Sequence, residues 1–198
     1  MPDPADQIRA NAEMLCTLYS RMRESVTHRS RSSVGRADWE AACAAFHDHF
    51  DELYFPGGDA GWRAFIAGTD EGIEAALLFL EVDQFTFRSG YHKQIVWDWL
   101  KKAGLTQAQY QRLEEVAVGY LYHRARREFW HMANFMRRHA AAPFWSRVES
   151  IAEHEPGDTA RKARWLLLVR KNLPVRRWIS NELLRSRYQS GYVPRLDF

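Results

Sequence analysis

Glu128 and His131 come nearest to a reactive site, because their types and spacing form an E-x-x-H pattern. On a helix this spacing directs both side chains toward one ligand, and di-iron helical bundles combine two such motifs with two further glutamates. The sequence contains one E-x-x-H pattern. We therefore expect a protein that binds no metal and no cofactor. A metal-dependent, di-iron-like helical enzyme is an alternative hypothesis. Its other ligands would be side chains that share a helix face in pairs: His47 with Asp51, and Glu74 with Glu81.

Glu128 also raises a question of burial, because helical periodicity places it on an apolar stripe. A buried carboxylate must be paired, protonated or metal-bound, since an unpaired buried charge costs several kcal/mol. We favour an ion pair with an arginine from another helix, and the candidates are Arg161, Arg164 and Arg170. The pattern leaves open whether Glu128 is a structural ion pair or a ligand.

Other catalytic motifs are missing from the sequence, which has no G-x-S-x-G, no P-loop and no G-x-G-x-x-G pattern. Cys16 and Cys43 lie on predicted apolar helix faces, where we expect buried, inert thiols. These features favour a protein without enzymatic activity.

The charged residues are unevenly distributed along the 198-residue chain. Residues 1–83 contain 7 basic and 15 acidic side chains, and residues 84–198 contain 21 and 10. Arg outnumbers Lys by 23 to 5, and guanidinium groups suit carboxylates, phosphates and aromatic faces. Either the acidic and basic parts pair with each other, or the basic part faces an external anion.

A surface rich in Arg and aromatic side chains is the candidate functional site. We expect a helical binding or regulatory protein that engages an acidic partner protein through this surface, with self-association as another form of contact. A nucleic-acid-binding helical protein that uses the same surface is the alternative. The candidate partner-binding residues are Arg124, Arg127, Trp130, His131, Arg138, Arg176 and Arg177.

The elements that must position these residues are predicted from apolar residues at three- and four-residue spacing. The patternless, Arg- and Ser-rich stretch 28–36 is predicted to be a surface loop that could contact anions or be phosphorylated, and Asp38 to cap the helix after it. The stretch 85–89 is predicted to be an extended connector without a partner strand. The eight or nine expected helices cover residues 5–24, 39–54, 61–67, 69–83, 90–103, 106–139, 143–154, 158–171 and 175–187.

The longest predicted helix, over 106–139, is the one that would assemble the binding surface. A capping box at Thr106 and Gln109 begins it. At 100° per residue, its polar face is basic and aromatic, opposite the apolar stripe. The charged residues on that face are Arg124, Arg127, His131 and Arg138.

The composition, 46% apolar and 27% charged, is typical of a globular protein. The longest apolar run, 75–80, is too short to span a bilayer, and the first residues lack the features of a signal peptide. We therefore expect a cytoplasmic all-α protein without membrane contact. The predicted fold is a single domain over residues 1–198, built as a compact bundle or as stacked helical hairpins.

Overall fold

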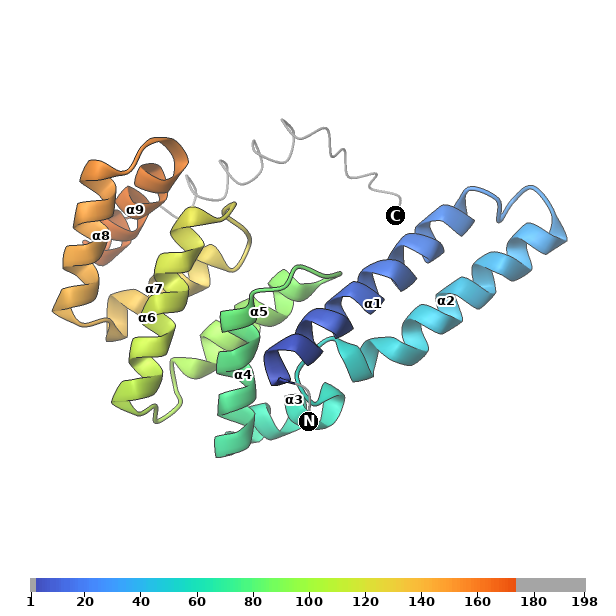
Figure 1. Cartoon of the computed structure of the whole chain (residues 1–198), viewed down its shortest axis with the longest axis horizontal. Helices are drawn as coiled ribbons and strands as arrows, with labels where there is room; N and C mark the ends of the chain where they lie inside the picture. The colour runs from blue at the N-terminus through green and yellow to red at the C-terminus, as the bar shows by residue number, and fades with distance from the viewer. Residues whose placement is uncertain (1–2, 174–198) are drawn as a thin grey trace. The chain divides into compact units, whose positions relative to one another are not determined.

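The computed structural model of the chain describes residues 3–173, and these residues form nine α-helices and no strand (Figure 1). The all-helical fold that the periodicity predicts is therefore confirmed. The predicted helix over 175–187, with Arg176 and Arg177, lies outside the described residues. The helices are α1 (Pro4–Val26), α2 (Ser33–Leu53), α3 (Gly58–Ala67), α4 (Asp70–Val82), α5 (Ser89–Leu100), α6 (Gln107–Tyr122), α7 (Phe129–His139), α8 (Ala142–His154) and α9 (Gly157–Arg170).

The chain divides into two compact units, Met1–Lys93 and Gln94–Phe198, and the division falls inside α5. The acidic part of the sequence, 1–83, belongs entirely to the first unit. The described part of the second unit, 94–173, contains 14 basic and 8 acidic side chains. The uneven charge of the sequence is therefore also a difference between the two units.

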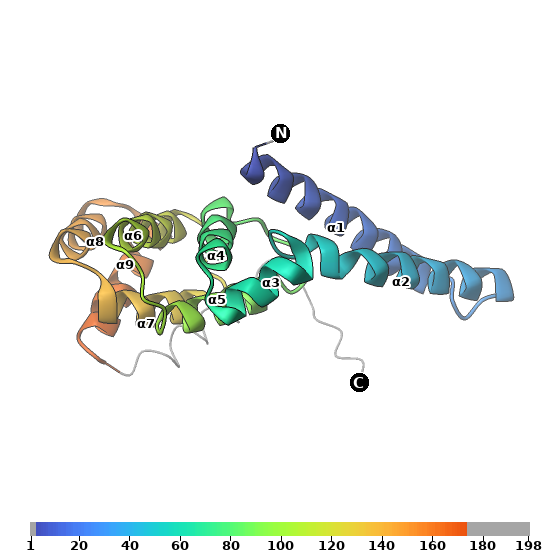
Figure 2. The ribbon, with the colours of Figure 1, turned by 90° about the horizontal axis from the view of Figure 1, so that it is seen from below.

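In the first unit, α1 and α2 form an antiparallel hairpin whose closed end points away from α3 and α4 (Figures 1 and 2). The hairpin turn covers 27–32, between the end of α1 and the start of α2. Ser32 is the N-cap of α2, and its Oγ accepts a hydrogen bond from the Gly35 N–H at 3.0 Å. The predicted loop 28–36 is therefore too long, and Asp38 lies inside the helix that it was expected to cap. A serine acceptor satisfies an unpaired N–H of the first helical turn, and this local signal does not require apolar periodicity.

An aromatic cluster joins the open end of the hairpin to the rest of the first unit. Phe46 is 2% exposed, and its ring centre lies 5.5 Å from those of Phe50 and Phe87. Tyr54 packs against His92 of α5, with 4.7 Å between ring centres. Such ring contacts are worth about 0.5–1.5 kcal/mol each beyond the area they bury. They fix the base of the hairpin on the connector before α5 and on the first turn of α5.

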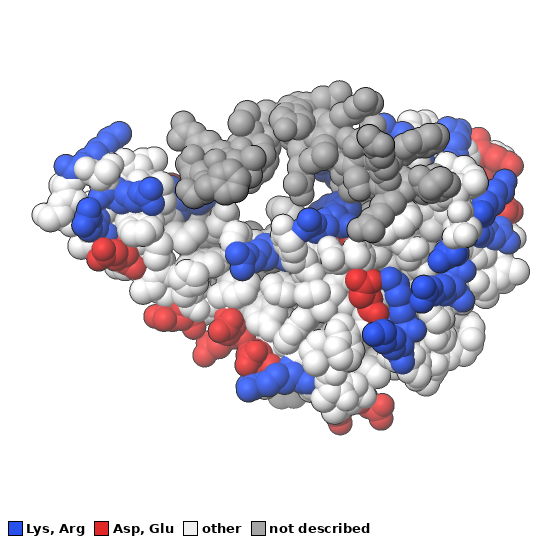
Figure 3. Space-filling view, turned by 180° about the vertical axis from the view of Figure 1, so that it is seen from behind, with Lys and Arg blue, Asp and Glu red and all other residues white. Residues whose placement is uncertain are grey.

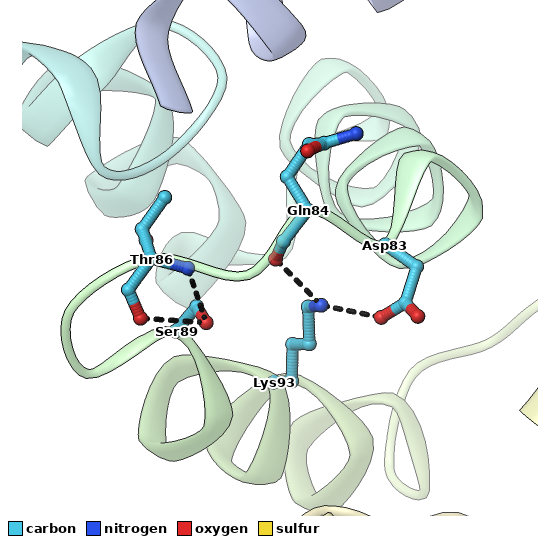
Figure 4. A network of polar contacts seen from close by, with 5 residues as sticks. All are labelled: Asp83, Gln84, Thr86, Ser89 and Lys93. Carbon is cyan, nitrogen blue, oxygen red and sulfur yellow. Dashed lines mark hydrogen bonds and ion pairs between the residues drawn. The ribbon is translucent and has the colours of Figure 1, made fainter. Parts of the chain in front are cut away.

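A fully buried lysine holds the segment between α4 and α5. The Lys93 side chain has no exposed surface, and its Nζ donates to the Asp83 carboxylate and, at 2.9 Å, to the Gln84 carbonyl oxygen (Figure 4). Asp83 has a left-handed backbone (φ 49°) at the C-cap of α4. The ion pair therefore stabilises the point at which α4 stops.

The rest of that segment is held by hydrogen bonds at the start of α5. The Thr86 N–H donates to the Ser89 Oγ, and this hydroxyl donates back to the Thr86 carbonyl oxygen, both at 3.0 Å. The connector predicted over 85–89 is non-helical as far as Arg88, and α5 begins at Ser89.

In the second unit, α9 packs against α6, α7 and α8. Trp165 and Leu166 of α9 are buried, in agreement with its strongly apolar sequence. Thr106 and Gln109 form the predicted capping box at the start of α6, with reciprocal hydrogen bonds of 2.9 and 3.3 Å.

The prediction of one long helix over 106–139 is wrong. α6 ends at Tyr122, His123 is extended (φ −96°, ψ 167°), and α7 begins at Phe129. α6 and α7 pack against each other and both pack against α9, which an unbroken helix would not allow. Residues 123–128 are therefore a connector between two packed helices.

A second buried lysine explains where α6 stops. Residues 123–128 contain neither Gly nor Pro, so local propensity favours a continuous helix. Lys162 of α9 is 1% exposed, donates to the His123 carbonyl oxygen and pairs with Asp158 at 2.9 Å. In a continuous helix that carbonyl would accept the N–H of Arg127. A contact from a distant part of the chain takes the place of that helical hydrogen bond.

Candidate partner-binding surface

The structure describes five of the seven predicted partner-binding residues. Arg124 and Arg127 are exposed in the connector before α7. Trp130 and His131 are half-buried in the first turn of α7, and Arg138 is exposed in its last turn. The other two, in 174–198, lie outside the described residues.

These residues do not share one helix face. The eleven residues of α7 span about 16 Å, which separates Arg127 from Arg138. The prediction of a continuous basic face is therefore wrong, because it required the helix to continue through 123–128. The predicted surface divides into one part before α7 and another at the end of α7.

His131 is engaged inside the second unit. Its Nδ1 lies 2.7 Å from Oδ2 of Asp98, and 17% of its side chain is exposed. Lys101 pairs with the other oxygen of the same carboxylate. Burial by itself would raise the pKa of Asp98, but the hydrogen bonds from Lys101 and His131 outweigh it and hold that pKa below its usual value. His131 thus joins α7 to α5, which is a structural role.

Basic side chains gather where α7 and α9 end, and two further lysines follow the end of α5. Arg137 donates from Nη1 to Oδ1 of Asn172, two residues after the end of α9, at 2.8 Å. Burial, followed by the charges of Arg138 and Lys101, lowers the pKa of His139. We name this group the basic edge. Its members are Lys101, Lys102, Arg137, Arg138, His139 and Lys171.

Three members of the basic edge form no ion pair with the described residues: Lys102, Arg138 and Lys171 are exposed and have no acidic partner there. Acidic residues of the same unit instead face other arginines. These ion pairs are Arg147 with Glu115, Arg170 with Glu149, and Arg161 with Asp158. The described carboxylates of the unit therefore leave the basic edge with an excess of positive charge.

Exposed apolar side chains flank the basic edge. Trp99 is 43% exposed and lies in the turn that the Lys102 N–H closes on the Trp99 carbonyl oxygen at 2.9 Å. Leu173 is 45% exposed and follows Lys171 by two residues. The edge thus combines cations with an aromatic and an aliphatic contact.

Two histidines make the stability of the protein dependent on pH. Burial lowers the pKa of His139, and burial together with the charge of Arg88 lowers that of His92, both from 6.5. As the pH falls below about 6.5, these two histidines bind protons more readily in the unfolded chain than in the folded chain. Their contribution to the free energy of unfolding is therefore fully present above this pH and is lost as the pH falls below it. We expect His92→Phe and His139→Phe each to flatten the loss of unfolding free energy between about pH 7.5 and 5.5, measured by urea titration. A wild-type stability that stays constant over this range contradicts the prediction.

The residues of the metal alternative are dispersed. No group of three or more His, Cys, Asp and Glu side chains within residues 3–173 is placed to hold a metal ion. His47 and Asp51 are exposed on α2, and Glu74 and Glu81 are exposed on α4. The structure therefore offers no support for the di-iron-like hypothesis.

Glu128 is buried, as its place on the apolar stripe predicts, with 2% of its surface exposed. It stands at the N-cap of α7, outside any long helix. Each of its three candidate partners has another contact: Arg161 pairs with Asp158, Arg164 donates to the Ala152 carbonyl oxygen, and Arg170 pairs with Glu149. The E-x-x-H pattern falls in the first turn of α7, where the histidine is bound to an aspartate of α5.

The cysteine prediction is wrong for one residue. Cys16 is exposed on α1, and its Sγ lies 3.7 Å from the Phe85 carbonyl oxygen. Cys43 is half-buried on α2. The helical pattern places Cys16 next to the buried Leu15, which is 1% exposed, but one step along a helix turns a side chain by about 100°.

The buried lysines are the structural residues that the sequence analysis missed. Lys93 shares a helical stripe with the buried residues Val96, Trp97 and Leu100. This three-, four- and seven-residue spacing is the available signal, because a lysine on such a stripe must bury its charge or extend out of the core. Lys162 stands in the same relation to the buried residues of α9.

In the described part of the chain, no helix is both long and apolar enough to cross a membrane. Comparisons with models of known protein families, with curated proteins and with solved structures find no match for this chain.

Proposed function

We propose that the protein is a non-enzymatic binding protein that engages an acidic partner protein through the basic edge of its second unit. The partner places carboxylates on Lys102, Arg138 and Lys171, and apolar side chains on Trp99 and Leu173. The observation that carries the proposal is the contact between the ends of α7 and α9, where Arg137 donates to Asn172 and the exposed Arg138 and Lys171 form no ion pair with the described residues.

The charged side chains of the basic edge and the apolar side chains that flank it contribute to binding in different ways in this proposal. The cations raise the rate of association and select acidic surfaces, and their effect weakens as salt screens them. Trp99 and Leu173 supply apolar area, and Trp and Arg are enriched among the residues that dominate protein interfaces. Phosphate binding needs no apolar contact. The combination of both therefore favours a protein partner.

The sequence-predicted contacts fit this proposal unequally. Arg138 belongs to the basic edge, and Arg176 and Arg177 follow Lys171 within six residues of the sequence. Arg124 and Arg127, at the other end of α7, stay predicted contacts beside Trp130. His131 is left out, because its Nδ1 is bound to Asp98.

The test compares the wild-type protein with the Lys102→Gln/Arg138→Gln/Lys171→Gln variant. The probe is a short fluorescent peptide rich in Glu and Leu, and binding is followed by fluorescence anisotropy at low and at physiological salt. We expect the variant to bind about tenfold more weakly at low salt, because three exposed charge contacts of about 0.2–1 kcal/mol each are lost. Trp99→Ala should weaken binding at both salt concentrations, since apolar burial is not screened.

The matched control is Arg9→Gln/Arg63→Gln/Arg147→Gln, which removes the same charge from exposed arginines that pair with nearby acids. We expect it to bind within about twofold of the wild type. Equal losses in the two triple variants would mean that net charge alone attracts the peptide. That result, or no binding at low salt, contradicts the proposal.

A further inference from the structure

The closed end of the α1–α2 hairpin is basic, although it belongs to the acidic unit. Residues 21–36 contain five arginines and one acidic residue, while the rest of 1–93 contains 4 basic and 14 acidic side chains. Figure 3 shows this separation, with Lys and Arg at the end of the hairpin, at the left, and Asp and Glu farther along the same unit. We name this end the hairpin tip. Its arginines are Arg21, Arg23, Arg29, Arg31 and Arg36.

Three of the tip arginines are available to an external anion. The Arg29 guanidinium lies over the Trp39 ring at 5.3 Å, and Arg21 is 4.0 Å from the Asp38 carboxylate. The others are exposed and form no ion pair within residues 3–173. They are Arg23, Arg31 and Arg36.

The backbone of the tip is held in a defined turn. A Cβ atom at Gly35 would lie 2.3 Å from the His28 carbonyl oxygen, so the first turn of α2 packs directly on the backbone of the hairpin turn. The Arg31 N–H donates to the same carbonyl at 3.0 Å, and the Arg36 N–H donates to the Ser32 carbonyl at 3.1 Å. Arg31 and Arg36 therefore extend from a fixed backbone.

We propose that the hairpin tip binds the phosphate backbone of a nucleic acid. Guanidinium groups donate two hydrogen bonds to one phosphate, and the exposed hydroxyls of Ser30 and Ser33 are further donors of the kind that contact phosphates. The Trp39 ring is half-buried and covered by the Arg29 guanidinium. Residues 21–36 contain no Phe, Tyr or Trp, and the exposed apolar side chains there are the aliphatic Val26 and Val34. The tip thus offers mainly charge and hydrogen bonds, without a large aromatic anchor, which suits sequence-independent phosphate binding better than a protein interface.

The acidic residues in the rest of the first unit limit the directions from which a polyanion can approach the hairpin tip. Its 14 acidic side chains repel phosphate, whereas the tip attracts it. The hairpin carries the arginines away from α3 and α4, so the tip can meet a nucleic acid before the acidic surface does (Figures 1 and 2). This contact uses no residue of the basic edge and goes beyond the proposed function.

The experiment measures binding of the full chain to fluorescent duplex DNA and single-stranded RNA over a series of salt concentrations. The variant is Arg23→Gln/Arg31→Gln/Arg36→Gln. We expect wild-type log affinity to fall linearly with log salt, and the variant to bind about tenfold more weakly at low salt. For duplex DNA its salt slope should be shallower by about 2 to 3, because each lost phosphate contact contributes about 0.9.

Two further variants separate this proposal from its rivals. The Arg9→Gln/Arg63→Gln/Arg147→Gln control and the Lys102→Gln/Arg138→Gln/Lys171→Gln variant should keep more of the wild-type salt slope than the tip variant does. All these residues are exposed, so equal urea midpoints would show that folding is unchanged. The proposal is overturned if neither nucleic acid binds at low salt or if the control loses as much as the tip variant. It is also overturned if the tip variant loses a Glu-rich peptide but keeps both nucleic acids, which would identify the tip as a protein-binding surface.

Discussion

Replacing Lys93 with methionine should lower the free energy of unfolding by about 3–5 kcal/mol, because it leaves a carboxylate without its buried cation. The Lys93 side chain has no exposed surface and that of Asp83 is 12% exposed, so water replaces little of the lost contact. The Gln84 carbonyl oxygen also loses its donor. The loss is measured by urea denaturation, followed by circular dichroism at neutral pH.

A double-mutant cycle distinguishes the ion pair from simple packing. Asp83→Asn removes the charge and keeps a residue type that tolerates the left-handed backbone at this position. We expect Lys93→Met/Asp83→Asn to cost about 1–3 kcal/mol less than the sum of the single substitutions. Lys102→Met, at an exposed lysine, should change stability by less than about 0.5 kcal/mol. Additive losses would show that Lys93 and Asp83 do not stabilise each other.

Gly72→Ala should destabilise the first unit by about 1–3 kcal/mol, although alanine is the better helix former. A Cβ atom at Gly72 would lie 2.3 Å from the backbone carbon of Ala64 and the backbone nitrogen of Phe65. These are main-chain atoms of α3, so they cannot move aside as a flexible side chain would. The substitution must therefore separate α3 from α4, which disturbs the packing of the buried Phe65 and Leu77. Thermal or urea unfolding measures the change.

Gly119→Ala is the matched control in the interior of α6. A Cβ atom there meets nothing within 4 Å, so only the gain in helix propensity applies. We expect Gly119→Ala to raise the free energy of unfolding by about 0.5–1 kcal/mol. If Gly72→Ala raised stability in the same way, the close approach of α3 and α4 would be contradicted.

The helices were predictable wherever local chemistry marks them. The capping box of Thr106 and Gln109 begins α6 as predicted, and the apolar stripe correctly indicated that Glu128 is buried. The stripe did not reveal the backbone around Glu128, because a residue at an N-cap and a residue inside a helix can both face a core. At Glu128 the local pattern thus identified burial but not the helix boundary.

The candidate site was less predictable because its prediction depended on one helix boundary. Joining α6 to α7 placed Arg124, Arg127 and Arg138 on a single face, and the connector over 123–128 separates them. The sequence also could not indicate that Arg137 meets Asn172, because the two residues are 35 positions apart along the chain. The basic edge is therefore a product of how the ends of the helices are brought together.

By itself, the sequence determined that the chain is helical, that its charge divides into an acidic and a basic part, and that arginines concentrate in the stretch 28–36, which was predicted to be a surface loop. Periodicity, composition and capping residues express these properties over a few neighbouring positions. Only the tertiary structure decided that α6 stops at Tyr122, because the hydrogen bond from Lys162 to the His123 carbonyl oxygen joins residues 39 positions apart. Such a long-range hydrogen bond competes with the hydrogen bond that a continuous helix would form at the same carbonyl. A pattern of neighbouring residues therefore cannot predict where the helix ends.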